Sequence, residues 1–303
     1  MMSQMLDIHA DDYAISLNSD KTILDLCRAE KLDSISFIPN LSYAQTAAQS
    51  LQAIQKKRKS PVRVSVHINF VEGRCCAEKS LVPELVDEQG FFTISWGKLF
   101  MWNYLPSRSR IRSQLKAEII AQTEKLISLG IIDKDHIRFD SHQHTHMIPL
   151  VFDALMDAIK ECGWGVDFIR NTEDPIHYYL GFPKLYASYS PINAIKCMIL
   201  NFYALTKVRP ALKKMKITPS LMCGVFFSGH MDKERLSKIL PVFKKKAGKK
   251  NRTTEILFHP CRMHEDEITN EFSKAAINDF HLSQNRIQEY ESVLALNFTK
   301  DSN

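Results

Sequence analysis

The sequence has no cysteine pairing of the kind that builds a disulfide framework or a thiolate zinc site. Its seven cysteines are scattered and odd in number, no CxxC motif occurs, and the adjacent Cys75 and Cys76 have poor geometry for a mutual bridge. Such usage is typical of reduced thiols. The opening residues MMSQMLDIHADD contain neither a basic segment nor an apolar one of the signal-peptide type. We therefore expect a cytoplasmic protein.

Long apolar runs, repeats and low-complexity tracts are also missing. The longest apolar stretch, INAIKCMILNFYAL, is interrupted by Lys196 and Asn201 and is too short to span a bilayer. It predicts an amphipathic or packing helix, and we expect no membrane partner. No linker divides the chain, so we interpret residues 1–303 as a single domain. Within it, residues 71–110 form an aromatic-rich insertion and residues 175–240 a variable segment.

A strong excess of charge of one sign is absent as well, since the formal net charge is only +6. Basic residues gather at 56–59 and 244–252, but no aromatic side chains are interleaved with either run. Nucleic-acid-binding surfaces usually combine the two. We interpret both runs as solvated turns between elements and expect no nucleic-acid partner.

Short strand-like runs alternate with helical patterns. Strands are predicted at residues 5–10, 34–39, 62–70, 136–141, 166–171 and 253–260, and helices at 19–30, 43–57, 112–130, 149–163 and 283–296. Ser19 or Asp20 can cap the first helix, and Gly130 ends the third. This order predicts parallel strands joined by crossover helices, and therefore an α/β fold, open or closed into a barrel.

Three of the predicted strands have one polar face. Polar side chains alternate with apolar ones in each, namely Ser65, His67 and Asn69, then Arg138, Asp140 and His142, then Glu255 and His259. Strands in α/β proteins are normally apolar on both faces, and ligands bind at the carboxyl ends of parallel strands. Because the titratable groups gather toward those ends, the pattern favours an enzyme.

Two carboxylates, Asp11 and Asp12, directly follow the first strand. Such a pair can divide its work, one binding a cation while its neighbour accepts a proton, although a turn or a helix cap would also explain it. His67 ends the third strand beside Asn69. It could be a histidine with a structural role or a metal ligand. His259 precedes Pro260 and suits an acid or base, and Arg170 can orient a carboxylate. Either could equally be an ordinary polar residue at a strand end.

The stretch FDSHQHTH, residues 139–146, is the densest cluster of potential ligands. An extended backbone would place Asp140, His142, His144 and His146 on one side, but about 6–7 Å apart in succession. One ion cannot accept all of them, so one or two histidines are expected as ligands and the others as neighbours. Two histidines and a carboxylate suit a divalent Lewis acid, which indicates metal-assisted hydrolysis of an amide, ester or phosphate.

The chain resembles the YdjC/ChbG-like carbohydrate deacetylases. The resemblance rests on HADDYAIS, VHINFVEG, FDSHQHTH, FIRNTEDP and EILFHP, which occur in the family's order over about residues 5–262. It implies a deformed, TIM-like (β/α) barrel. It also implies a metal-dependent hydrolase that uses activated water to remove acetyl groups from N-acetylated sugars such as chito-oligosaccharides.

The resemblance also implies roles for particular residues. Asp12, His67 and His142 would bind one divalent ion, with Mg²⁺ expected first and Zn²⁺ or another ion as alternatives. Asp11 would be the base, His259 the acid toward the leaving amine, and Arg170 would hold Asp11 or the substrate. His144 and His146 occupy motif positions without an assigned role, and Asn69 and Glu255 are expected beside the ligands or the substrate.

The chain departs from the family pattern at His9, Ala14 and Cys261, none of which removes a ligand. In the insertion, Trp96 and Trp102 are expected to form a sugar-stacking lid, with a packed loop or dimer contact as the alternative. The sequence of residues 175–216 matches the family pattern poorly, so the identity of the sugar substrate is left open. Because the family often dimerises, a homodimer is possible.

Two other functions compete with this interpretation. A metal phosphoesterase of the polymerase-and-histidinol-phosphatase type would usually have an HxH pair on its first strand, where this chain has ADD. A non-catalytic sugar- or metal-binding relative would need neither the base nor the acid, yet Asp11 and His259 are both present.

Overall fold

The computed structural model describes residues 6–188, 191–272 and 275–296. Seven parallel strands form one sheet in the order β5-β4-β3-β2-β1-β7-β6. They are β1 (Leu6–Tyr13), β2 (Ser34–Phe37), β3 (Arg63–Ile68), β4 (Ile137–Ser141), β5 (Val166–Ile169), β6 (Leu221–Cys223) and β7 (Thr254–Phe258). The predicted α/β fold with parallel strands is therefore confirmed.

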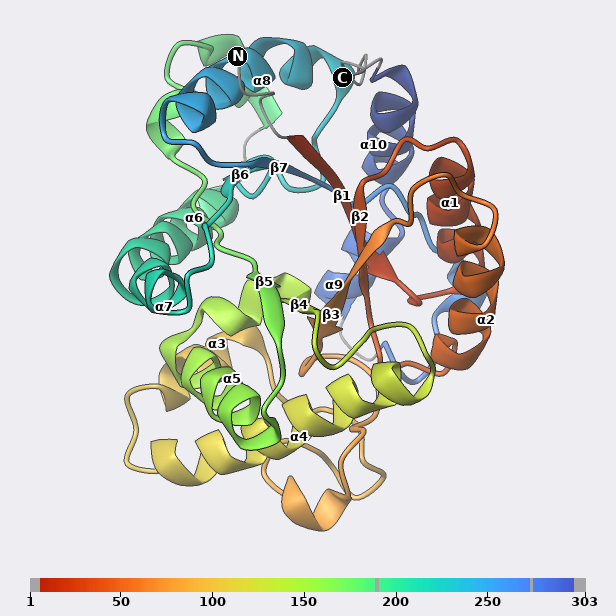
Figure 1. Ribbon diagram of the computed structural model, residues 1–303, viewed down its shortest axis with the longest axis vertical. Coiled ribbons are helices and arrows are strands. Elements are labelled where there is room, and N and C mark those ends of the chain that lie inside the picture. Colours follow the sequence, from red (N-terminus) through yellow and green to blue (C-terminus); the bar gives the residue numbers. More distant parts are fainter. Residues whose placement is uncertain (1–5, 189–190, 273–274, 297–303) are drawn as a thin grey trace.

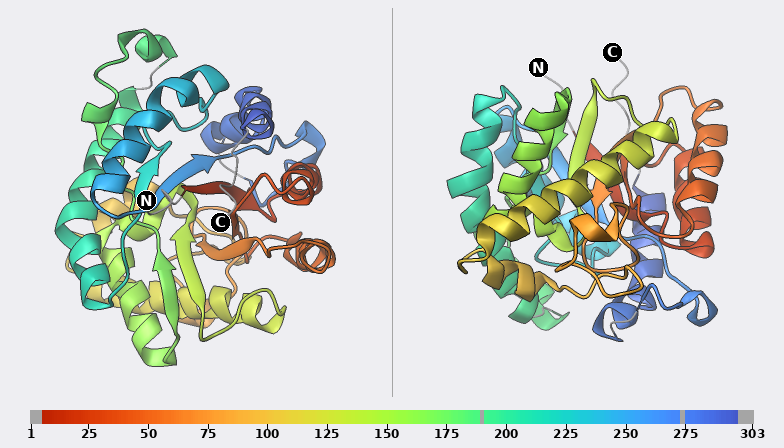
Figure 2. Two further views of the ribbon diagram at one scale, coloured as in Figure 1. Left: turned by 45° about the horizontal axis from the view of Figure 1, so that its top comes forward. Right: turned by 90° about the horizontal axis from the view of Figure 1, so that it is seen from below.

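The sheet curls into an incomplete barrel with helices around its outside (Figures 1 and 2). Its two edges are β5 and β6, which do not pair as strands. The chain leaving β5 nevertheless reaches the other edge, because the backbone N–H of Met222 donates to the carbonyl of Glu173 at 2.9 Å. The deformed barrel that the resemblance implies is confirmed.

Ten α-helices lie within the described ranges. They are α1 (Leu17–Arg28), α2 (Ala44–Gln55), α3 (Trp96–Trp102), α4 (Arg108–Ser128), α5 (Pro149–Cys162), α6 (Pro191–Tyr203), α7 (Arg209–Lys214), α8 (Lys233–Lys249), α9 (Ala275–His281) and α10 (Asn285–Ala295). Shorter helical turns include η1 (Lys79–Leu81), η2 (His142–Met147), η3 (Ile176–Tyr178), η4 (Pro183–Ser188), η5 (Ala204–Val208) and η6 (Glu265–Glu267). None of the helices in these ranges has the length and apolar character needed to cross a bilayer.

The predicted cap of the first helix is wrong by three or four positions. The helix begins at Leu17, and the side chain of Ser16 accepts a hydrogen bond from the backbone N–H of Ser19. Asp20 lies inside the first turn, and its carboxylate accepts from the backbone N–H of Ala14 at 2.7 Å. That bond stabilises Ala14 at φ 74°, a conformation that side chains rarely adopt.

The interpretation of residues 244–252 as a turn is also wrong. Residues up to Lys249 belong to α8, whose buried stripe of Leu236, Ile239, Phe243 and Ala247 follows helical spacing. The lysines lie between these positions on the solvent side, so a charged face was mistaken for a connection. The run at residues 56–59, in contrast, follows the end of α2 as a turn.

The two segments that break the alternation contain most of the additional elements. The insertion at 71–110 includes η1, α3 and the start of α4, which begins four residues before its predicted start. The variable segment at 175–240 contains α6, η5 and α7, followed by the three-residue edge strand β6. The helix predicted from INAIKCMILNFYAL is confirmed as α6 and η5.

The interior of the curled sheet is polar where a barrel is usually filled by branched apolar side chains. His9, Ser36, Asp140, Arg170 and Glu255 are all fully buried there. Polar groups in such a place require partners, because an unpaired buried charge is strongly destabilising. Their hydrogen bonds connect the interior to the carboxyl ends of the strands, where the candidate site lies.

Candidate active site and metal centre

The two aspartates at the end of β1 both point into the site because the strand is interrupted. Between Ala10 and Tyr13 its pairing with β2 shifts by one residue, as in a β-bulge. Asp12 has φ 67°, a left-handed conformation that aspartate tolerates better than most residues. In an uninterrupted strand, consecutive side chains would point to opposite faces. The bulge therefore lets Asp11 and Asp12 face one cavity together.

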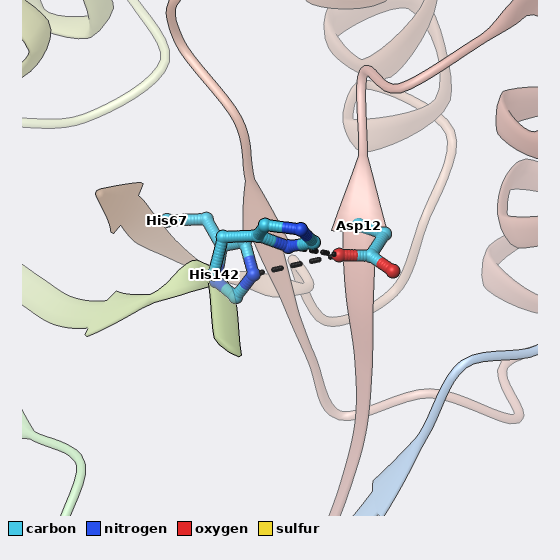
Figure 3. Close-up of side chains that lie close together, drawn as sticks. All are labelled: Asp12, His67 and His142. Carbon is cyan, nitrogen blue, oxygen red and sulfur yellow. Dashed lines mark hydrogen bonds and ion pairs between the residues drawn. The ribbon is translucent and has the colours of Figure 1, made fainter. Parts of the chain in front are cut away.

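Asp12, His67 and His142 converge from β1, β3 and the end of β4 (Figure 3). Asp12 Oδ1 lies 3.0 Å from His142 Nδ1 and 3.6 Å from His67 Nε2. One potential ligand atom from each residue lies within 4.8 Å of the other two. All three side chains are buried, so the group forms one compact N, N, O donor set.

His67 is oriented by a second carboxylate. Its Nδ1 lies 2.6 Å from Asp140 Oδ1, and a carboxylate at that distance accepts a hydrogen bond from the ring N–H. Asp140 itself accepts from Ser36 Oγ at 2.5 Å. The Nε2 atom of His67 is thus aimed at Asp12. A carboxylate behind a histidine in this way is the usual support of a histidine ligand in metal sites.

The electrostatics of the cluster favour positive charge. Burial by itself lowers the pKa of an imidazole, but the Asp11 and Asp140 carboxylates raise the pKa of His67 to about 9. The Asp12 and Glu72 carboxylates likewise raise the pKa of His142 to about 10 against the effect of burial. The carboxylates around both histidines therefore stabilise positive charge here, whether protons or a bound cation carry it.

Glu72 and His281 complete the surroundings of His142. Glu72 Oε2 lies 3.1 Å from His142 Nε2, and Glu72 Oε1 lies 3.1 Å from His281 Nε2. The His142 and His281 rings are stacked with centroids 6.0 Å apart. Burial raises the pKa of Glu72, but His281 and His142 outweigh it and lower the value to about 2. Neither Glu72 nor His281 is among the site residues predicted from the sequence.

Asp11 is held in a different way from its neighbour. Arg170 Nη1 and Nη2 donate to its two oxygens at 2.9 and 2.8 Å, in a two-point contact. Burial raises the pKa of Asp11, but the charges of Arg170 and His67 outweigh it and hold the value well below its usual range. Asp11 is therefore ionised, and its position is fixed by a guanidinium rather than by the two histidines of the donor set.

Arg170 lies among three carboxylates. Besides Asp11, it donates from Nε to Glu255 Oε1 at 2.8 Å and lies 3.2 Å from Asp140 Oδ2. Glu255 also accepts from Ser220 Oγ at 3.0 Å. Glu255 thus contacts Arg170 and does not line the cavity.

His259 lies at the end of β7 across the cavity from β3. Its Nε2 is 4.0 Å from Asp11 Oδ2, and its Nδ1 is 3.9 Å from Glu289. Burial lowers the pKa of His259 to about 4. His259 is therefore neutral at pH 7, in contrast to His67 and His142.

The extended backbone expected through residues 140–146 is wrong. β4 ends at Ser141, and Gln143 and His144 then adopt positive φ values of 55° and 58° within η2. His142 and His144 line the cavity as a result. His146 turns away, with Nε2 bonded to the carbonyl of Arg170 at 2.9 Å and Nδ1 to Ser141 Oγ at 2.6 Å. His146 thus ties η2 to the strand end that carries Arg170.

Asn69 shapes the loop that carries Glu72. Its Oδ1 accepts from the backbone N–H groups of Val71 and Glu72, and its Nδ2 donates to the carbonyl of Glu72 and to Asn40 Oδ1. All of these bonds are buried. Asn69 therefore acts on the site through the backbone of Glu72 rather than by lining the cavity.

The cavity has a volume of about 180 Å³. Among the predicted residues, its lining includes Asp11, Asp12, His67, His142, His144 and His259; residues that were not predicted include Asn193, Lys196, Ser228 and Phe280. Neither Trp96 nor Trp102 belongs to the lining. Trp96 lies one step away, with its ring 6.0 Å from Lys196 Nζ and stacked on Phe100.

Lys196 is the cation of the cavity wall. It is half-buried, and burial lowers its pKa to about 8, so the amine is still mostly protonated at pH 7. It comes from α6, within the variable segment at 175–240. Because it lies in an apolar stretch, the sequence predicts a packing helix there and not a site residue.

The chain is similar to known proteins along most of its length. The family model described as "YdjC-like protein" matches residues 5–301. A carbohydrate deacetylase of Xenopus laevis is 29% identical over 157 residues, which are 52% of this chain and 47% of that protein. A carbohydrate deacetylase of Clostridium beijerinckii is 25% identical over 207 residues, or 68% of this chain and 72% of that one. A chitooligosaccharide deacetylase of Escherichia fergusonii is 26% identical over 54% of this chain and 58% of its own.

The chain spans about half the length of the vertebrate relatives that it matches. Among solved structures, a proposed cellobiose-phosphate cleavage protein of Enterococcus faecalis superimposes with a TM-score of 0.61. The superposition covers 95% of this chain and 93% of that one at 17% identity. At this identity the likeness supports the fold.

Proposed function

This chain belongs to the family of YdjC-like proteins, and from that membership we propose that it is a metal-dependent hydrolase that removes acetyl groups from N-acetylated amino sugars. One observation carries the proposal. Two adjacent carboxylates face one cavity in different settings, Asp12 beside two histidines and Asp11 against a guanidinium. Paired groups with separate environments are what a hydrolytic site requires when one binds a cation and the other moves a proton.

The donor set of Asp12, His67 and His142 fits a divalent ion. The three side chains are buried and converge, and Asp140 fixes the ring orientation of His67. A divalent ion bound there would supply a Lewis acid that polarises the acetyl carbonyl and lowers the pKa of water. Imidazole nitrogens suit Zn²⁺ and related ions, whereas Mg²⁺ prefers oxygen ligands. The expectation of Mg²⁺ therefore stays a prediction, to be tested against Zn²⁺.

Asp11 is proposed as the base. Its carboxylate is ionised and has a fixed orientation, because Arg170 contacts both oxygens. During attack of water on the acetyl carbon, the carbon–oxygen bond forms and Asp11 takes one proton from the water. In this proposal Arg170 is a positioning residue.

His259 is proposed to deliver a proton to the leaving amine. A neutral imidazole is a poor acid, so it must first gain a proton, and Asp11 Oδ2 lies 4.0 Å from its Nε2. The proton that Asp11 takes can pass to His259, whose low pKa makes the resulting imidazolium a strong acid. When the carbon–nitrogen bond breaks, His259 gives that proton to the amine, and acetate and a free amino sugar result.

The experiment that tests the proposal is acetate release from a small N-acetylglucosamine oligomer. The purified protein is stripped with a chelator and assayed alone, with Zn²⁺ and with Mg²⁺. We expect acetate only after an ion is restored. His142→Ala should lose both bound metal and turnover, and if it keeps both, the assigned site is wrong. Phosphate release from p-nitrophenyl phosphate without acetate release would indicate a phosphoesterase instead.

A protein that binds metal and sugar but releases no acetate from any of a panel of acetylated sugars would be the non-catalytic relative. The panel also identifies the sugar, which the sequence leaves open. A cytoplasmic location and a homodimer stay predictions, to be tested by fractionation and by analytical ultracentrifugation.

A further inference from the structure

Exposed apolar side chains are concentrated in two segments of the chain. Of the thirteen large apolar side chains that are exposed in the described ranges, nine come from residues 101–105 and 180–205. These nine are Met101, Tyr104, Leu105, Leu180, Ile192, Ile195, Met198, Phe202 and Leu205. An isolated exposed leucine needs no explanation, but a contiguous patch usually marks a binding surface.

Five of these residues form a stripe along α6 and η5. Ile192, Ile195, Met198, Phe202 and Leu205 follow one another at intervals of three or four residues, the spacing of one helix face. Ile192 is 76% exposed and Phe202 61%. The opposite face, which includes Cys197 and Leu200, is buried in the core. This helix is thus apolar on two faces, and only one of them is covered within the described chain.

The end of α3 extends the same surface. Tyr104 and Tyr203 share a hydrogen bond at 2.6 Å between their hydroxyl groups, and Lys196 Nζ lies 6.0 Å from the Trp96 ring. Tyr104 is nevertheless 64% exposed. The two segments that the proposed chemistry leaves unused, the aromatic insertion and the variable segment, therefore meet in one apolar patch. Figures 1 and 2 show α6 and α7 at the periphery of the molecule, across the sheet from α1 and α2.

The segment that carries the stripe is basic, and of its charges Lys207 pairs with Asp153 and Arg209 with Glu173. Between Asp174 and Asp232 the sequence contains no acidic residue and seven basic ones, which exceeds the net charge of +6 for the whole chain. Arg209, Lys213, Lys214 and Lys216 follow the stripe and are exposed, as is Lys184. A second copy of the same surface would meet it with like charge. An anionic surface would match it.

We propose that α3, α6 and α7 dock this protein on an anionic membrane surface. An apolar helix face with interfacial aromatic side chains and flanking lysines is the pattern of helices that lie in the headgroup region without spanning the bilayer. Such peripheral contact does not need a long apolar run, the absence of which led to the expectation of no membrane partner. The helix that supplies the stripe also supplies Asn193 and Lys196 to the cavity wall, so docking would place that wall of the cavity nearest the bilayer. If the proposed function holds, the acetylated sugar would then come from the bilayer side.

Vesicle co-sedimentation tests the docking. The full chain is mixed with vesicles of phosphatidylcholine alone or of equal parts phosphatidylcholine and phosphatidylglycerol, at low and at high salt. We expect binding to the mixed vesicles that weakens with salt. Each basic residue near such a surface contributes about fivefold to partitioning, so Lys213→Gln/Lys214→Gln should bind at least ~10-fold more weakly. The triple variant Ile195→Gln/Met198→Gln/Phe202→Gln should lose a similar factor or more.

Leu81→Gln is the matched control, because Leu81 is 56% exposed but lies on η1 outside the patch. It should bind as wild type does. No binding to the mixed vesicles, equal binding to both vesicle types, or an equal loss in Leu81→Gln would overturn the proposal. So would a dimer in analytical ultracentrifugation that the triple variant converts to monomer.

Acetate release from a soluble oligomer separates this proposal from the proposed function. None of the substituted residues belongs to the cavity lining, so the variants should retain the wild-type rate on that substrate. Vesicle binding without any acetate release would leave the docking intact and contradict only the proposed function. Acetate release without vesicle binding would contradict the docking and leave the proposed function intact.

Discussion

Arg170 provides a sharp test of the electrostatic account of the interior. It is fully buried and lies against three carboxylates, at 2.8 and 2.9 Å from Asp11, 2.8 Å from Glu255 and 3.2 Å from Asp140. Arg170→Met retains much of the side-chain volume but removes the charge and all five donors. The three carboxylates would then repel one another with no guanidinium between them.

Breaking a buried ion pair by removing one partner destabilises a protein by about 3–5 kcal/mol. In a chain of this size, each kcal/mol lowers the melting temperature by ~2 °C, so we expect a decrease of roughly 6–10 °C. Glu255→Gln in the same chain removes one of the stranded charges. The double variant should therefore be more stable than Arg170→Met by about 1–3 kcal/mol.

Arg112→Met is the matched control. Arg112 also makes a two-point contact with an aspartate, Asp157, at 2.6 Å to each oxygen, but that pair is partly exposed to solvent. Such pairs contribute only about 0–1 kcal/mol. Urea unfolding at neutral pH, with thermal melts as a second probe, measures all four proteins. If Arg170→Met costs no more than Arg112→Met, Arg170 does not neutralise the interior and the reasoning fails.

Further predictions concern pH, backbone geometry and metal binding. Burial raises the pKa of Glu118 from 4.5 to about 7, so its contribution to stability is present below pH 4.5 and is lost as pH rises through 7; urea titrations should show a shallower loss for Glu118→Gln. Gly224 has φ +135°, and an added Cβ would lie 2.8 Å from the carbonyl oxygen of Leu257, so Gly224→Ala should lose about 1–3 kcal/mol in urea unfolding. Gly181→Ala, which meets nothing within 4 Å, should be nearly neutral. Zn²⁺ at ~100 times its Kd should stabilise wild type by about 2.7 kcal/mol in thermal melts and leave His67→Ala unchanged.

The sequence predicts the fold well where elements are long and periodic. The alternation in residues 62–70 places His67 on the interior side of β3, and the helices at 43–57 and 149–163 match α2 and α5 within a few residues. The edge strand β6 is missed because three residues are too few to show a period. The helix α8 is obscured by its lysines, since its buried face follows a spacing that the basic run conceals.

The site is predictable only in part, for identifiable reasons. Strand parity brings His67 and His259 to one edge of the sheet, as expected from the parallel order. The bulge that turns both Asp11 and Asp12 inward adds one extra residue to β1 and has no signal in the pattern of apolar residues. The left-handed turn after Ser141 likewise cannot be inferred from FDSHQHTH, and it decides which histidines reach the cavity.

Other residues of the site come from far along the chain. Glu72 follows β3 in a loop, whereas His281 ends α9, and only the folded chain brings them together. Glu72 could have been suspected, because it follows the polar face of residues 62–70. His281 and Lys196 lie in helical stretches without any motif, and no spacing in the sequence connects them to the site.

The most direct test of the central claim is the metal content and turnover of Asp11→Asn. Asp11 is a base in this account and not a ligand, so the variant should bind Zn²⁺ in the same stoichiometry as wild type. The variant should fold, because Arg170 keeps its contacts with Glu255 and Asp140. Thermal melts check this. We expect acetate release from an N-acetylglucosamine oligomer to fall by at least ~100-fold, the range of general-base catalysis. Metal-loaded Asp11→Asn that releases acetate at the wild-type rate would contradict the account.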